Sequence, residues 1–115
     1  MSSPFQDMLE ALMRLRGVTA VMLVDEHEGM IIDAALQFGQ DGDRVAALAA
    51  SLYRKARLSA AAAGLGEASF MQLEAEQGRI CAVGRAEMVL VVVAAAAANV
   101  GLVRVEMLKA SRDIG

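Results

Sequence analysis

The chain has 115 residues, of which 57% are hydrophobic and only 3% aromatic, and its formal net charge is -3 at pH 7. This composition is too apolar for a disordered chain, and the lack of any run of Lys or Arg argues against a nucleic-acid-binding protein. A domain of this size buries roughly 65% of the surface of its unfolded chain. So large an apolar fraction therefore predicts a further buried surface, in an oligomer or against a partner.

The N-terminal stretch Met-Ser-Ser-Pro-Phe-Gln-Asp has neither a basic start nor an apolar core, so it predicts no signal peptide. No apolar run reaches the roughly 20 residues that a helix needs to cross a bilayer. Cys81 is the only cysteine, which excludes a disulfide framework within the chain and a metal-binding Cys pair. We therefore expect a single domain over residues 1–115 that is cytoplasmic and not inserted into a membrane.

The first third of the chain predicts a helix followed by a hairpin. Residues 3–16 form an amphipathic pattern, and Ser3 stands where a helix cap is expected. Thr19–Asp25 is a nearly unbroken apolar strand, and Met30–Leu36 returns after a turn that contains glycine. The polar Asp33 on the second strand favours a position for this strand at the edge of the sheet, with one side exposed to solvent.

A long helix is expected over residues 43–63, with Asp41 or Asp43 as its cap and Gly64 at its end. A helical wheel separates two faces. The face expected to pack on the core consists of larger residues and some alanines: Val45, Leu48, Ala49, Leu52, Tyr53, Ala56 and Ala60. The other face is mostly Ala and Ser, broken by two arginines, and we interpret it as a helix-pairing surface: Ala46, Ala47, Ala50, Ser51, Leu58, Ala61 and Ala62.

Three strands and a closing helix follow. Alternation begins at Glu67, and tight turns separate this strand from 79–84 and Met88–Ala95, which predicts an antiparallel meander. The run from Met88 is apolar on successive residues, so both faces of that strand are expected to be buried at the centre of the sheet. Asn99 is expected to cap a helix over 100–114. These elements predict an α+β fold.

Three local patterns occur in register. They are residues 15–25 (Leu-Arg-Gly-Val-Thr-Ala-Val-Met-Leu-Val-Asp) followed by Gly-Met-Ile-Ile at 29–32, residues 43–52 at the start of the long helix, and Asn-Val-Gly-Leu-Val-Arg at 99–104. Together they resemble the opening, the long helix and the Asn-x-Gly-x-x-Arg helix start of the Roadblock family, the dynein light-chain and bacterial gliding-motility GTPase-regulator domain. The resemblance covers nearly the whole chain.

The resemblance implies a Roadblock-like architecture. Its sheet would have five antiparallel strands in the order 2-1-5-4-3, with the long helix on one face and the first and last helices on the other. Members of the family pair through the long helix and the third strand. In this chain that implies a dimer interface made of Ala46, Ala47, Ala50, Ser51, Leu58, Ala61, Phe70, Met71, Gln72 and Leu73.

The function that the resemblance implies is a homodimeric, non-enzymatic regulatory module that binds a small Ras-like GTPase. It would modulate the nucleotide cycle, by activation rather than inhibition, with GTP and Mg²⁺ held by the partner and no cofactor on this chain. Arg54, Lys55 and Arg57 would dock against an acidic surface of the partner. A role in which one of these arginines reaches the transferring phosphate of GTP is less favoured.

Two alternatives stay open: a structural adaptor dimer in a motor or signalling assembly, without nucleotide dependence, and a small-molecule-sensing domain. An enzyme is the least favoured class because no acid, base and nucleophile converge. His27 lies between two Glu in a turn without a second nitrogen or sulfur ligand, and Cys81 lies in a strand far from it. We interpret them as a solvated turn residue and a buried, inert thiol, and expect no catalytic residue and no metal site.

Overall fold

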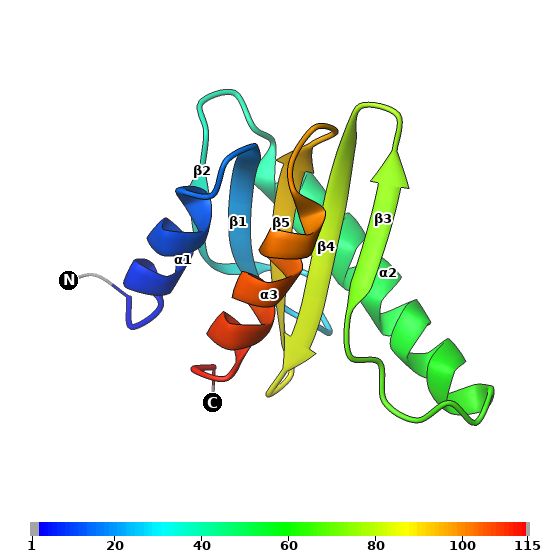
Figure 1. The fold of residues 1–115 in the computed structure, drawn as a ribbon. Helices are drawn as coiled ribbons and strands as arrows, with labels where there is room; N and C mark the ends of the chain where they lie inside the picture. The colour runs from blue at the N-terminus through cyan, green and yellow to red at the C-terminus, as the bar shows by residue number, and fades with distance from the viewer. Residues whose placement is uncertain (1–2, 115) are drawn as a thin grey trace.

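The computed structural model describes residues 3–114 (Figure 1). Three helices and five strands follow one another along the chain: α1 (Gln6–Met13), β1 (Val18–Asp25), β2 (Ile31–Leu36), α2 (Gly42–Ala62), β3 (Met71–Ala75), β4 (Gly78–Arg85), β5 (Met88–Ala95) and α3 (Val100–Ser111). None of these helices is both long enough and apolar enough to cross a membrane.

The five strands form one antiparallel sheet in the order β2-β1-β5-β4-β3, which confirms the implied topology. The two most continuously apolar strands, β1 and β5, are neighbours in its interior, where Val21 pairs with Val92. Both side chains are fully buried. The prediction that the run from Met88 lies at the centre of the sheet is therefore confirmed, and β2, which carries Asp33, is an edge strand as expected.

The helices lie in two layers, with α1 and α3 on one face of the sheet and α2 on the other (Figure 1). Successive residues of β1 point to opposite faces, so Leu23 joins the core beneath α1 and α3, whereas Met22 joins the core beneath α2. A strand that feeds two cores has to be apolar at every position, which explains why β1 and β5 show no alternation.

The helix caps follow the sequence closely. Asp41 Oδ1 accepts a hydrogen bond from the Arg44 N–H at 3.3 Å, and Asn99 Oδ1 accepts one from the Leu102 N–H at 3.1 Å. Gly64 has φ 75° and closes α2 in the left-handed conformation that favours glycine. These two hydrogen bonds and the conformation of Gly64 fix both ends of α2 and the start of α3 where the sequence predicted them.

Other boundaries differ from the prediction. Helix α1 begins only after Phe5, so Ser3 is not its N-cap residue; the Ser3 Oγ instead accepts a hydrogen bond from the Phe5 N–H at 3.0 Å. Strand β3 begins at Met71, the first residue that pairs with β4, so residues 67–70 form a loop. Pairing with a neighbouring strand, which alternation alone does not reveal, decides where an edge strand starts.

Candidate functional site

The faces of α2 agree only in part with the helical wheel: Ala49 and Tyr53 are buried and Leu58 is exposed, as predicted. Ala46 and Ala50, expected at a dimer interface, are 0% and 1% exposed and belong to the core beneath α2. Leu48 and Leu52, expected in the core, point away from it. The physical reason is that alanines let the helix backbone approach the sheet closely, so the small residues face inward. The assignment of Ala46 and Ala50 to the outer face is therefore wrong.

The outer face of α2 instead carries exposed leucines. Leu48, Leu52 and Leu58 are 56%, 39% and 55% exposed, and Ala47 and Ala61 are also exposed. Large apolar side chains that gather on one helix face are typical of surfaces that contact another protein. The outer face is thus more apolar than predicted, because Leu48 and Leu52 lie on it in place of Ala46 and Ala50, which are buried.

The edge strand β3 is the last strand of the sheet, and it pairs with β4 on one side only. Gln72 and Leu73 are exposed on it, whereas Met71 is half-buried against the core beneath α2. Phe70, just before the strand, packs on the opposite face, where the Arg104 guanidinium lies 4.9 Å from its ring centroid. Of the four residues predicted for the interface here, Gln72 and Leu73 are the accessible ones.

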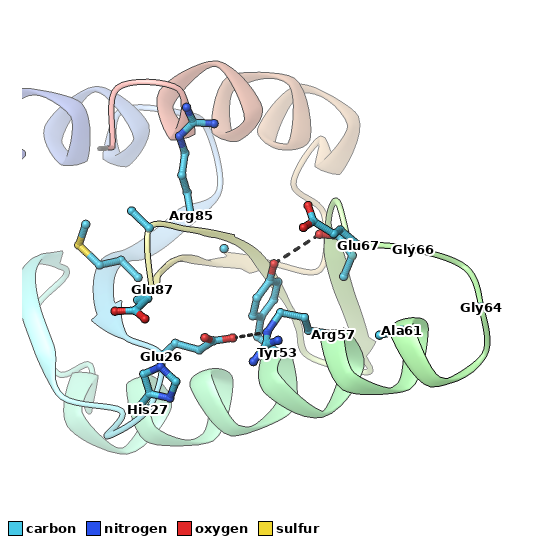
Figure 2. Close-up of a pocket in the computed structure, with 14 residues that line it drawn as sticks. Glu26, His27, Tyr53, Arg57, Ala61, Gly64, Gly66, Glu67, Arg85 and Glu87 are labelled. Atoms are coloured by element: carbon cyan, nitrogen blue, oxygen red, sulfur yellow. Dashed lines mark hydrogen bonds and ion pairs between the residues drawn. The ribbon is translucent and has the colours of Figure 1, made fainter.

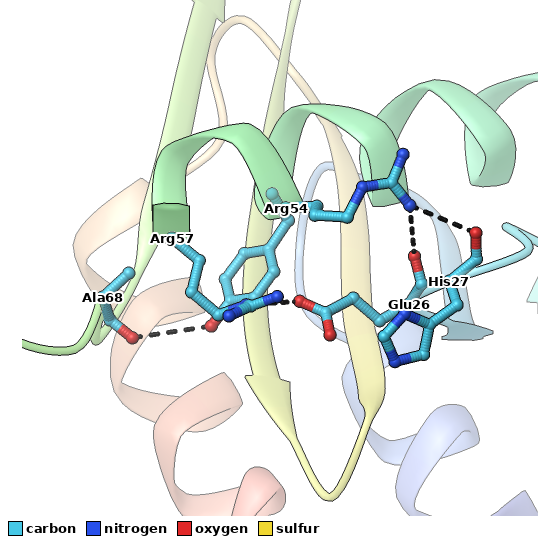
Figure 3. Close-up of polar contacts among 6 residues, drawn as sticks. Glu26, His27, Arg54, Arg57 and Ala68 are labelled. Atoms are coloured by element: carbon cyan, nitrogen blue, oxygen red, sulfur yellow. Dashed lines mark hydrogen bonds and ion pairs between the residues drawn. The ribbon is translucent and has the colours of Figure 1, made fainter. Parts of the chain in front are cut away.

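Two of the three predicted docking cations are held within the chain (Figure 3). Arg54 Nη1 donates to the carbonyl oxygens of Glu26 and His27, at 3.3 and 3.1 Å. Arg57 Nε donates to Glu26 Oε1 at 2.7 Å in an ion pair whose carboxylate is largely buried. Both arginines therefore fasten the β1–β2 turn to α2. Lys55 is exposed and has no ion pair within residues 3–114.

These contacts form one wall of an open cleft of about 830 Å³. It lies where the β1–β2 turn, the second half of α2, the loop after α2 and the β4–β5 turn converge (Figure 2). Polar and small residues line it: Glu26, His27, Tyr53, Arg57, Ala61, Gly64, Gly66, Glu67, Ala68, Gly84, Arg85, Ala86, Glu87 and Met88. The sequence analysis did not predict this cleft.

Tyr53 forms the floor of the cleft, where its ring lies against Gly84. Its hydroxyl donates to the Ala68 carbonyl oxygen over a long 3.5 Å. Burial raises the pKa of this hydroxyl above 10.0, and the charges of Glu26 and Glu67 act in the same direction. A hydrogen bond with the Gly84 backbone and the charge of Arg57 oppose the shift without cancelling it.

The β4–β5 turn beside the cleft has an unusual backbone. Ala86 and Glu87 have φ 54° and 64°, in the left-handed region that residues with a Cβ rarely adopt. Arg85 pairs with Met88, so Ala86 and Glu87 between them are the two central residues of a hairpin turn. Asn-Gly is the common choice at these two positions. The Glu26 N–H donates to the Glu87 carbonyl oxygen at 3.0 Å and joins this turn to the β1–β2 turn.

The remaining candidates give no sign of catalysis. His27 is exposed at the cleft, as the solvated-turn interpretation predicted. Cys81 is fully buried, and burial raises the pKa of its thiol, which is the opposite of what a nucleophile needs. Within residues 3–114 no three His, Cys, Asp or Glu side chains form a group that could hold a metal ion.

A model of the Roadblock/LC7 domain matches residues 4–94 of the chain. The chain belongs to the Roadblock/LC7 domain family. Three uncharacterized proteins of Methanocaldococcus jannaschii are each 31% identical to it over 103 residues, which is 90% of this chain and 90%, 90% and 86% of theirs. The resemblance on which the sequence analysis relied is thereby confirmed.

Solved structures agree with this assignment. The Roadblock/LC7 domain from Streptomyces avermitilis superposes with a TM-score of 0.86 at 19% identity, over 97% of this chain and 95% of that one. MglB of Myxococcus xanthus gives 0.82 at 25% identity, over 97% and 94%. MglC of the same organism gives 0.67 at 18% identity, over 95% and 94%. The three helices and the sheet order of this chain are therefore those of Roadblock domains.

Proposed function

We propose that this Roadblock domain is a homodimeric, non-enzymatic module that binds a small Ras-like GTPase and modulates its nucleotide cycle, by activation rather than inhibition. Roadblock domains are regulatory or adaptor modules rather than catalysts. The observation that carries the proposal is the outer face of α2, where Leu48, Leu52 and Leu58 are exposed together. A chain of 115 residues seldom leaves such a face in water unless another protein covers it.

Pairing of two copies would use this face together with the free edge of β3. The unpaired backbone groups of an edge strand favour addition of another strand. Leu73 is exposed on that edge, so strand pairing would bury an apolar side chain as well. We revise the predicted interface accordingly. Leu48 and Leu52 are added to it, and these residues of the original prediction are kept: Ala47, Ser51, Leu58, Ala61, Gln72 and Leu73.

The module would act by ordering the switch segments of the GTPase, with GTP and Mg²⁺ held by that partner. Arg54 and Arg57 are engaged by Glu26 and the β1–β2 turn, so releasing either would cost the contacts that hold this turn. Lys55 is exposed and is the cation best placed for docking on an acidic partner surface. The free energy of binding to the GTPase, rather than an arginine inserted into its active site, would then modulate the nucleotide cycle.

The proposal is tested by calorimetry, which measures the affinity of this chain for a small GTPase whose gene neighbours the gene of this chain. We expect binding that is at least tenfold tighter for the GTP-analogue form than for the GDP form, because a regulator has to distinguish the two states. Lys55→Glu should weaken this binding, and Lys109→Glu, on α3 across the sheet, serves as the matched control. The absence of binding to either nucleotide form would refute the proposal.

The alternative is a structural adaptor dimer without nucleotide dependence. The internal engagement of Arg54 and Arg57 favours it, because neither of these two arginines is free to stabilise charge on a transferring phosphate. Equal affinity for the GTP-analogue and GDP forms would select this alternative.

A further inference from the structure

We propose that the cleft between the β1–β2 and β4–β5 turns receives a basic side chain, preferably an arginine, from a protein partner. The proposal extends the GTPase-binding function and rests on it for the nature of the partner.

The charges that face the cleft are mainly negative. Glu67 and Glu87 line it and have no ion pair within residues 3–114. Arg57 is already paired with Glu26, so these two charges offset each other. Arg85 is directed away toward the segment that follows α3, where its Nε donates to the Ile114 carbonyl oxygen at 3.0 Å (Figure 2). An anion would therefore meet two unpaired carboxylates, whereas a cation would be attracted.

A buried carboxylate adds a second reason. Glu26 lines the cleft although it is only 7% exposed. Its Oε1 accepts from Arg57, while its Oε2 has no hydrogen-bond partner among the described residues. The Ala68 carbonyl oxygen also retains acceptor capacity, because its bond from Tyr53 is long. A guanidinium carries five donors in a planar fork, which suits acceptors that are spread around a cleft better than a single ammonium does.

The size of the cleft favours a cation carried by a protein. At about 830 Å³ it has room for a side chain together with part of the backbone that bears it. The cleft also borders the second half of α2, through Arg57 and Ala61, next to the outer face proposed for partner binding. A partner seated on that face could thus place a loop arginine in the cleft.

The test is an NMR titration of ¹⁵N-labelled protein with two blocked tripeptides, acetyl-Gly-Arg-Gly-amide and its uncharged isostere acetyl-Gly-citrulline-Gly-amide. We expect saturable shifts of the Glu67, Gly84 and Glu87 amides with the arginine peptide only. Glu67→Gln and Glu87→Gln should each weaken binding about threefold, and together about tenfold. Glu76→Gln, in the exposed β3–β4 turn, is the matched control and should change nothing.

Equal shifts with citrulline, shifts away from the cleft, or an unchanged affinity in the double variant would overturn the inference. The same double variant separates this inference from the proposed function. If the GTPase binds the double variant as tightly as wild type, the cleft inference fails while the proposed function stands. If the arginine peptide binds the cleft and no GTPase binds the chain, the proposed function fails and the cleft keeps its cation specificity.

Discussion

The ring of Tyr53 occupies the space that a Cβ atom at Gly84 would need: such an atom would lie 2.6 Å from Tyr53 Cζ. Real Cβ atoms do not approach other carbon atoms so closely, so the two positions are linked. Glycine in the interior of a strand is unfavourable in itself, and here it marks a close approach of another side chain. Tyr53 and Gly84 together hold α2 against β4 and form the floor of the cleft.

We therefore predict that Gly84→Ala destabilises the fold by about 1–3 kcal/mol, because the added methyl group overpacks a buried contact. Urea unfolding followed by circular dichroism measures this loss. Combining Gly84→Ala with Tyr53→Leu should cost less than the sum of the two single changes, because the smaller side chain makes room for the methyl group. Strictly additive costs would show that the two residues are not coupled through this contact.

The ion pair of Glu26 and Arg57 leads to the second prediction. Glu26 is buried, so Arg57→Ala leaves a carboxylate without its partner and should cost about 1–3 kcal/mol. The double variant Glu26→Gln with Arg57→Gln should recover part of this loss, because no buried charge remains. Chemical denaturation of the three variants gives the comparison.

The control for this pair is Lys109, which lies 3.6 Å from Glu106 on the exposed surface of α3. Lys109→Ala should change stability by less than about 0.5 kcal/mol, since exposed pairs contribute little. A loss for Arg57→Ala as small as that for Lys109→Ala would contradict the prediction and indicate that Glu26 is well solvated after the arginine is removed.

Alkaline pH is expected to destabilise the protein. Burial raises the pKa of Cys81 and of Tyr53 above their usual 9.0 and 10.0. The folded state thus keeps both protons at pH values where the unfolded state has begun to lose them. The stability that these two protons contribute should be complete below pH 9 and should be lost as pH rises through and above 9 to 10. Thermal unfolding from neutral pH to pH 10.5 follows this change, and Cys81→Ala should reduce its steepness.

The sequence predicted the fold well because its strongest signals are local. The apolar runs of β1 and β5 have no alternation, which identifies strands covered on both faces. Asn99, Asp41 and Gly64 carry their own hydrogen-bond or backbone preferences, so the helix ends that depend on them were predicted correctly. The start of β3 depends instead on its pairing with β4, and this start was misplaced.

The faces of α2 could not be predicted from periodicity alone. A wheel ranks residues by size and polarity, and it placed Leu48 inward and Ala46 outward. The distance between the helix and the sheet decides which residues of α2 face the core. This distance is set by tertiary contacts such as that of Tyr53 with Gly84. The cleft was missed for a related reason. Its lining residues come from four separate segments, and only folding brings Glu26, Glu67 and Glu87 together.

The last prediction concerns the outer face of α2. Replacing Leu48 and Leu52 by Lys in one variant should leave the monomer folded, because both side chains already point to solvent in a single chain. It should prevent pairing, because two lysines from each copy would be buried without partners at the same interface. Light scattering at micromolar concentration should give about 24 kDa for the wild type, twice the 12.1 kDa of one chain, and about 12 kDa for the variant.

Leu102→Lys is the matched control for this variant. Leu102 is also exposed, but it lies on α3 across the sheet, so this change should leave the dimer mass unaltered. A wild-type protein that is a strict monomer at micromolar concentration would refute the pairing itself. A dimer that Leu102→Lys disrupts, and that the double lysine variant of α2 leaves intact, would place the interface on the opposite face of the sheet and make the leucines of α2 a surface for the partner alone.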